Sequence, residues 1–224
     1  VAAPNDELRG SIGSATSPFS TAGVLAGVVA QGTDAASFQV GLNTANAGVF
    51  NGSATATFVS HNGEMADLAL DSTVLTLKGQ VNNYAEASLL KTGGSGTLFK
   101  VGNTYTLDFG TLALGGADSS GTLAVFNSAV GPADLLRGSF DLSGIGPEFL
   151  LDGFTSFAGL VAGASQGGLG ITFDSATLGA FEDIIVLHSF GSNASGFDAA
   201  LAATTLVLRG DAQMTRSEER RGGK

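Results

Sequence analysis

The sequence contains no cysteine and no tryptophan, and only two tyrosines and four prolines among its 224 residues. The absence of cysteine excludes disulfide bridges, thiolate catalysis and thiolate metal sites. Basic residues are scarce as well, since ten Lys and Arg stand against twenty Asp and Glu and give a formal net charge of −10. Nucleic acid binding needs clustered basic side chains, so we expect no nucleic acid partner. Anionic membrane surfaces are disfavoured for the same reason.

The chain also lacks the long apolar runs and the short motifs that mark membrane spans and enzymes. No apolar run reaches the roughly 18–20 residues that cross a bilayer, so we expect no membrane insertion within this sequence. Its one Gly-x-Ser-x-Gly pattern, at 163–167, is followed by a predicted strand and not by a helix, so it does not support the elbow of a serine hydrolase. No phosphate-binding loop with its Lys-Ser/Thr is present. The adjacent acids Glu182 and Asp183 would point to opposite faces of a strand, whereas glycoside hydrolysis needs two carboxyl groups about 5–10 Å apart in one cleft. We therefore expect no catalytic site and no cofactor.

Glycine and phenylalanine dominate what is present, with 34 and 15 residues, and the phenylalanines are the main large residues for a core. Short strand-like runs, most of them with apolar residues at alternate positions and one, 184–188, apolar almost throughout, are separated by turn-forming Gly, Asn, Asp and Ser. In the second half these runs are 104–109, 121–127, 137–142, 149–151, 169–174, 184–188 and 204–209. Seven such strands in roughly 110 residues predict an antiparallel, immunoglobulin-like β-sandwich. Short helical turns are predicted at 156–163 and 197–203.

The second half of the chain repeats the first. Segment 48–79 returns as segment 179–210 with a constant offset of 131 residues (179 − 48), and segment 4–11 returns as 132–139 with an offset of 128 (132 − 4). The matched residues include Gly48, Phe50, Asn62, Asp67, Leu77 and Gly79 in the first copy and Gly179, Phe181, Asn193, Asp198, Leu208 and Gly210 in the second. A repeat of this length is a whole domain. The sequence therefore predicts tandem β-sandwich domains.

The repeat also sets the expected domain boundaries. The run 104–127 precedes the second copy and its counterpart would precede the sequence, so we expect a first domain at 1–84 that lacks its first strands. The alternative is a natural domain with fewer strands. A complete domain is expected at 85–212, with Gly93–Gly96 as a flexible stretch after the junction. Residues 213–224 break the composition of the chain and resemble a translated sequencing adapter, so we expect a disordered, non-native tail.

Three segments of the second domain resemble those of a known family. Leu107–Gly115 contains an apolar-Phe-Gly start and an apolar-Gly end, Leu123–Asn127 is a strand that ends in Asn, and Leu160–Ser165 follows later. This pattern resembles the choice-of-anchor D type of bacterial surface module, which is related to the Hydin-like immunoglobulin folds. The resemblance covers about 98–212 and, without its first strands, 4–81. It implies a tandem module of an exported protein, extracellular or at the cell surface, with its anchor in a separate C-terminal signal.

Few residues are candidates for binding. Asn62 and Asp67 recur as Asn193 and Asp198, and oxygen-rich loops can hold calcium, which takes six to eight oxygen ligands. Because acidic residues are scarce in these loops, we interpret all four mainly as turn-forming residues and only as weak calcium candidates.

Histidine and arginine offer no stronger site. His61 falls in a loop and is a weak metal candidate, whereas His188 falls in an apolar strand and is expected to be structural. Their positions in the two copies differ, which excludes a shared histidine site. Arg9 and Arg137 do recur, and we interpret them as solvated strand residues or as partners of two recurring acids. Those acids are Asp6 and Asp134.

These patterns predict a non-enzymatic structural or adhesive repeat module of a large exported bacterial surface protein. Its expected partners are neighbouring repeats, with surface proteins or glycans as further candidates. The alternative is a carbohydrate- or calcium-binding accessory module of a secreted multidomain protein. Against sugar binding stands the small aromatic supply, since the chain has only Tyr84 and Tyr105 besides phenylalanine. A β-solenoid would show a period of about 20–30 residues, which we do not find.

Overall fold

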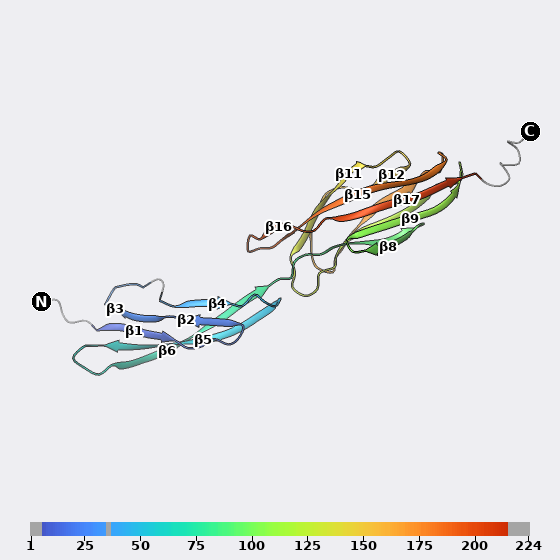
Figure 1. Cartoon of the computed structure of the whole chain (residues 1–224). Helices are drawn as coiled ribbons and strands as arrows, with labels where there is room; N and C mark the ends of the chain where they lie inside the picture. The colour runs from blue at the N-terminus through green and yellow to red at the C-terminus, as the bar shows by residue number, and fades with distance from the viewer. Residues whose placement is uncertain (1–5, 35–36, 215–224) are drawn as a thin grey trace, which may run out of the picture. The chain divides into compact units, whose positions relative to one another are not determined.

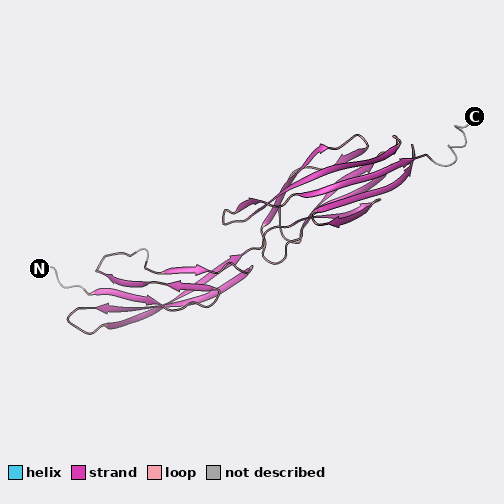
Figure 2. Cartoon of the chain, viewed as in Figure 1, coloured by secondary structure: helices cyan, strands magenta, loops and turns pink. Residues whose placement is uncertain are grey.

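The structure is a computed structural model that describes residues 6–34 and 37–214. Figures 1 and 2 show a chain of strands and loops, and no helix occurs among the described residues. The all-β prediction is therefore confirmed. The same residues contain no helix of the length and apolarity that a bilayer span requires. The chain divides between Asn82 and Asn83 into two compact units, called unit 1 and unit 2 below.

Unit 1 consists of two sheets. Its strands are β1 (Glu7–Ile12), β2 (Phe19–Ala22), β3 (Val24–Val28), β4 (Gln39–Leu42), β5 (Gly48–His61) and β6 (Leu68–Val81). Four strands pair in the order β3-β1-β5-β6, and β2 pairs with β4 in a second sheet. Phe19 of β2, Ala54 of β5 and Leu77 of β6 form a small core, joined by half-buried apolar residues from both sheets.

Unit 2 is a larger sandwich. Its strands are β7 (Ala87–Gly94), β8 (Thr97–Val101), β9 (Thr104–Ala113), β10 (Ser119–Asn127), β11 (Leu135–Gly144), β12 (Phe149–Asp152), β13 (Phe157–Leu160), β14 (Ser165–Phe173), β15 (Gly179–Ser192), β16 (Asp198–Ala200) and β17 (Thr204–Gln213). One sheet has the order β12-β14-β10-β7. The other has the order β13-β11-β15-β17-β9-β8, with β16 paired to β15. All pairs are antiparallel except β9 with β17, which is parallel.

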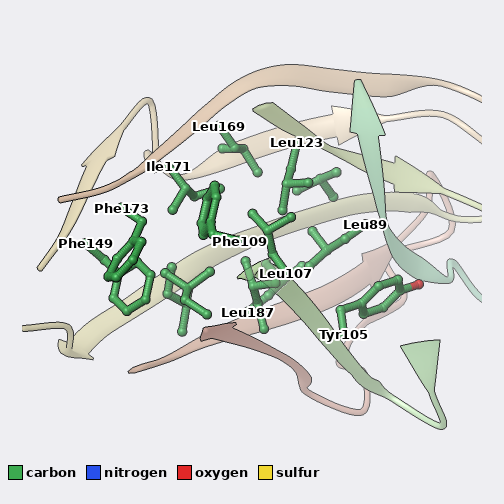
Figure 3. Packing of buried hydrophobic residues seen from close by; sticks show 14 of the residues in the cluster. Leu89, Tyr105, Leu107, Phe109, Leu123, Phe149, Leu169, Ile171, Phe173 and Leu187 are labelled. Carbon is green, nitrogen blue, oxygen red and sulfur yellow. The ribbon is translucent and has the colours of Figure 1, made fainter. Parts of the chain in front are cut away.

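The core of unit 2 lies between these sheets, as Figure 3 shows. Alternation along β14 directs Leu169, Ile171 and Phe173 inward, and each is at most 3 % exposed. Leu107 of β9 and Leu208 of β17 face them from the other sheet with no exposed surface. The period-two pattern predicted this face, because successive strand residues point to opposite sides. The immunoglobulin-like β-sandwich is thus confirmed for unit 2.

The two units repeat one pairing scheme. In unit 1 the sheet order β3-β1-β5-β6 matches β13-β11-β15-β17 in unit 2, and β2-β4 matches β12-β14. Glu7 pairs with His61 where Leu135 pairs with Ser192, at the sequence offsets of 128 (135 − 7) and 131 (192 − 61). Even the irregularity recurs, since the pairing of β1 with β3 shifts after Leu8, as that of β11 with β13 shifts at the matching position. The internal repeat in the sequence is therefore a repeat in three dimensions.

One recurring glycine explains how the sheets approach each other. A Cβ atom on Gly210 of β17 would lie 2.5 Å from the ring of Phe173, and one on Gly79 of β6 would lie 2.7 Å from Cδ2 of Leu42. Real Cβ atoms do not come so close to other atoms. Glycine at this position therefore lets the end of β14 pack directly on the backbone of β17 in unit 2. In unit 1 it lets the end of β4 pack on the backbone of β6 in the same way.

Several local expectations were wrong. The predicted helical turns at 156–163 and 197–203 contain strands β13 and β16 instead. Gly93 and Gly94 belong to β7, so the expected flexible stretch is ordered strand and turn, and Gly94 (φ +72°) and Gly96 (φ +80°) form the turn.

The unit division lies at Asn82, near the predicted junction at 84. Strand β17 includes Gln213, one residue of the expected tail, and residues 215–224 lie outside the described residues.

Candidate functional site

Asn62 lies in the loop between β5 and β6 and is hydrogen-bonded to Asp6, the residue directly before β1. Its Nδ2 donates to Oδ1 of Asp6 at 3.0 Å, and its Oδ1 accepts the backbone N–H of Glu64 at 3.0 Å. The hydroxyl of Ser60 donates to the other oxygen of Asp6 at 2.7 Å. The hydrogen bond from Ser60, followed by that from Asn62, lowers the pKa of Asp6 below its ordinary value, and the charge of His61 adds to the effect.

The same bridge recurs in unit 2. Nδ2 of Asn193 donates to Oδ1 of Asp134 at 2.8 Å, and Oδ1 of Asn193 accepts the N–H of Ser195 at 3.0 Å. Asp134 is 2 % exposed. Sequence reasoning noted that these asparagines and aspartates recur but did not join them. The structure shows an Asn–Asp bridge that ties the loop after β5 or β15 to the start of β1 or β11.

Each arginine pairs with an acid that was not expected. Nη2 of Arg9 lies 3.2 Å from Oε2 of Glu7. Nη2 of Arg137 donates to both carboxylate oxygens of Asp198, at 2.7 and 2.9 Å, and the guanidinium lies 4.4 Å from the ring centroid of Phe190. Both pairs are substantially exposed, so each contributes little to stability. Asp198 thus serves as the partner of a strand arginine.

The four weak calcium candidates are all engaged by protein groups. Asp67 lies with its Oδ1 2.7 Å from Nδ1 of His61, and Asp198 pairs with Arg137. The oxygens of Asn62 and Asn193 accept backbone N–H groups two residues ahead, which is the geometry of Asx turns. Within residues 6–34 and 37–214 no three His, Asp or Glu side chains gather as a metal site would require.

The remaining candidates are separate from one another. His188 lies exposed in the middle of β15, opposite Ser139 of β11. Of the adjacent acids, Glu182 accepts a hydrogen bond from Nε of Arg209 at 2.7 Å, and Asp183 accepts the backbone N–H of Gly146 at 2.6 Å. The two carboxylates thus serve different parts of the surface, as strand alternation predicts.

A charged depression on unit 2 was not predicted. It has a volume of about 410 Å³ and lies where β9, β15 and β17 meet. Its lining includes Asp108, Glu182, Arg209 and Asp211, together with the half-buried Phe181. The pairing of β9 with β17 is interrupted between Arg209 and Asp211, and such bulges redirect side chains at sheet surfaces.

The charged groups of the depression already have protein partners. Oδ1 of Asp108 accepts the N–H of Gly110 at 2.7 Å, and Oδ2 of Asp211 accepts from the amide of Gln213 at 2.6 Å. Arg209 is held by Glu182. The arrangement presents fixed polar groups that can hydrogen-bond a polar ligand. Its residues come from strands about thirty to a hundred positions apart in sequence, which is why no local motif signals it.

Comparisons with known proteins give no family, because no family model and no curated protein matches the chain. Several solved structures are similar to it. The VesB protease of Vibrio cholerae is 17 % identical at a TM-score of 0.35, over 47 % of this chain and 30 % of the protease. PapD-like domain 7 of human CEP192 is 12 % identical at a TM-score of 0.37, over 58 % of this chain and 87 % of that domain.

A third similar structure is a protein of unknown function from Porphyromonas gingivalis W83. It is 12 % identical at a TM-score of 0.34, over 93 % of this chain and 86 % of that protein. This chain spans less than a third of the protease chain. Since all three TM-scores are below 0.5, the fold assignment rests on the strand pairing and the core of the chain itself.

Proposed function

We propose that the chain is a non-enzymatic structural module of a large exported bacterial surface protein, built from tandem β-sandwich repeats. The observation that carries the proposal is strand polarity. In unit 1, β1 is antiparallel to β5 and β5 is antiparallel to β6, so β1 and β6 run in the same direction. Over the described residues, the chain therefore begins β1 at one end of unit 1 and completes β6 at the other end.

Unit 2 has the same property. Strand β17 is parallel to β9, and in Figure 1 β17 ends at the opposite end of the unit from the one at which the chain arrives. A unit with entry and exit at opposite ends transmits tension along its length. When its ends are pulled, the hydrogen bonds of the terminal strands are loaded together, because they lie perpendicular to the strands. Such a unit suits a spacer that must resist force.

Single-molecule pulling tests this role. The chain has no cysteine, so two introduced cysteines define the pulling points without side reactions. Cysteines at the exposed Glu86 and Gln213 (E86C/Q213C) load unit 2 from end to end. Cysteines at Leu178 and Gln213 (L178C/Q213C) open the β15–β17 ladder from the end where Gly179 pairs with Ala212. This second geometry breaks the hydrogen bonds one pair at a time.

We expect the end-to-end geometry to require a several-fold higher unfolding force than the zipper geometry. Equal forces in the two geometries would contradict a load-bearing role. The location of the protein needs a separate test, in which an antibody against the chain is applied to intact cells that carry the parent gene. Labelling only after the cells are broken would contradict export to the surface.

The charged depression favours one second candidate, a carbohydrate-binding accessory role. Fixed acids, Arg209 and Phe181 line the depression and supply polar and aromatic groups of the kind that bind sugars. A glycan array run with the chain and with an Asp108→Ala, Arg209→Ala double variant tests this candidate. Glycan binding that the double variant loses would support the carbohydrate-binding role. An array without hits would contradict that role and leave the structural role as the remaining candidate.

A further inference from the structure

Strands β9 and β10 fill a large share of the core of unit 2. Strand β9 pairs with the outer edge of β17, and β10 pairs with the edge of β14. Their inward residues are at most 7 % exposed and lie between the two sheets. These residues include Leu107 and Phe109 from β9 and Leu123 and Val125 from β10, and Figure 3 labels three of these four.

Unit 1 presents the same two edges without these strands. Among the described residues, β6 is the last strand of its sheet, and β4 pairs only with β2. Apolar residues at core positions of these sheets are exposed, although their counterparts in unit 2 are not. Val40 of β4 is 49 % exposed where Ile171 is 0 % exposed, and Leu8 of β1 is 38 % exposed where Leu136 is 0 % exposed.

The charge at the β6 edge also matches a strand of the β9 type. In unit 2, Arg209 of β17 stands opposite Asp108 of β9 in the parallel ladder. The repeat offset places Lys78 of β6 at the position of Arg209, and Lys78 is exposed. An incoming strand with an acid at the position of Asp108 would therefore meet a cation on β6.

We propose that unit 1 is a strand acceptor that binds a strand pair of the β9–β10 type. The β9-like strand adds parallel to β6, and the β10-like strand adds antiparallel to β4, so that the inward apolar residues of the pair cover Val40, Leu42 and Leu75. Backbone hydrogen bonds supply affinity and the alternate side chains supply specificity in such strand addition. A long unpaired edge beside exposed apolar residues is otherwise an aggregation site.

A second copy of unit 1 fits the site less well than a strand pair does. Two copies joined through β6 would meet in the antiparallel sense about a two-fold axis, whereas unit 2 shows a parallel partner on the matching edge. Such a dimer would also leave the edge of β4 and the face around Val40 uncovered. One strand pair covers both edges at once.

The test uses the full chain with an added strand pair. A copy of residues 104–131 is joined to Pro4, which places it before β1 as β9 and β10 stand before β11. Hydrogen exchange at the amides of residues 73–81 in β6 is then measured. The matched control carries serine at four inward positions of the copy, so that strand length and linker are unchanged. Those changes are L107S, F109S, L123S and V125S within the copy.

We expect the added copy to slow exchange at alternate β6 amides by about tenfold or more, and the serine control to leave them as in the unmodified chain. The amides of β17 serve as an internal reference and should not change. A second arm adds the synthetic peptide 104–131 to the unmodified chain, and chemical shift changes in Val40 and Leu75 are expected.

Two results would overturn the proposal. One is unchanged β6 exchange in the fused chain together with no shift change on addition of the peptide. The other is a concentration-dependent dimer of the unmodified chain, seen by sedimentation equilibrium, whose β6 amides are already protected, since a second copy would then be the occupant. Neither result bears on the pulling experiment with unit 2.

Discussion

Replacement of Asn127 by leucine should destabilise unit 2 strongly, because this side chain satisfies four backbone groups in the core. Asn127 has no exposed surface. Its Nδ2 donates to the carbonyls of Asp134 (3.1 Å) and Leu160 (3.0 Å), and its Oδ1 accepts from the N–H groups of Glu86 (3.1 Å) and Ala129 (3.3 Å). A single amide thus joins four segments of the chain at the end of β10.

The size of the effect follows from those four bonds. Each buried hydrogen bond contributes about 0.5–1.5 kcal/mol net, so their loss should lower the free energy of unfolding of unit 2 by about 2–6 kcal/mol. Leucine has the same number and branching of side-chain heavy atoms as asparagine and is larger, so a cavity is not the cause. Asn127→Asp should also destabilise, because a carboxylate offers no donor to the carbonyls of Asp134 and Leu160.

The assay is urea unfolding of the full chain followed by tyrosine fluorescence. Both tyrosines, Tyr84 and Tyr105, belong to unit 2, so the signal reports that unit alone. The control is Asn103→Leu at an exposed position just before β9, which should change the free energy by less than about 0.5 kcal/mol. If Asn127→Leu stays within about 1 kcal/mol of the unchanged chain, the assigned role of this side chain is wrong.

Three further outcomes are expected. Gly210→Ala should destabilise unit 2 by about 1–3 kcal/mol in urea unfolding because its Cβ would meet a buried ring, whereas Gly79→Ala should cost less because a flexible leucine end can move. Arg137→Ala should change stability by less than about 1 kcal/mol, as an exposed ion pair does. The NMR titration midpoint of Asp6 should lie below that of an ordinary aspartate and rise in Asn62→Ala; because its pKa is lowered, its contribution to stability is present at neutral pH and is lost as the pH falls through that midpoint.

Strands with a clean alternation were predictable from the sequence. In β14 the residues Leu169, Ile171 and Phe173 alternate with polar or small residues, and all three are buried as predicted. The apolar run Ile184–His188 was expected in a central strand, and β15 does lie between β11 and β17. In β14 the alternation marks the buried face, whereas the continuous apolar run of β15 indicates a central strand but not its buried face, since Ile184 is 44 % exposed and Ile185 is 1 % exposed.

Strands without such a pattern were not predictable. Strand β7 ends in Gly93 and Gly94. Two consecutive glycines near a domain junction indicate a flexible linker as long as the strand that pairs with them is unknown. That partner is β10, whose Thr122 stands opposite Gly93. Strands β13 and β16 are short, and their pairing with β11 and β15 gives them a conformation that their local sequences do not specify.

The candidate site shows the same division between local and non-local information. The recurrence of Asn62 and Asn193 was visible in the sequence, and their turn geometry follows from residue type. Their bonds to Asp6 and Asp134 depend on the register of β1 with β5 and of β11 with β15, which only the fold supplies. The charged depression is formed by residues of three strands, β9, β15 and β17, so no local sequence motif predicts it.

A comparison of the two units distinguishes the features that define strand pairing from the side chains that fill the core. The register, the recurring glycine at 79 and 210 and the Asn–Asp bridge are the same in both units. The inward residues are not, since Ala54 and Ala56 of β5 replace Ile185 and Leu187 of β15. Each missing methylene removes about 0.8 kcal/mol of apolar burial. Unit 1 therefore keeps the backbone scheme with a thinner core, and an added strand pair would supply the apolar surface that its own residues lack.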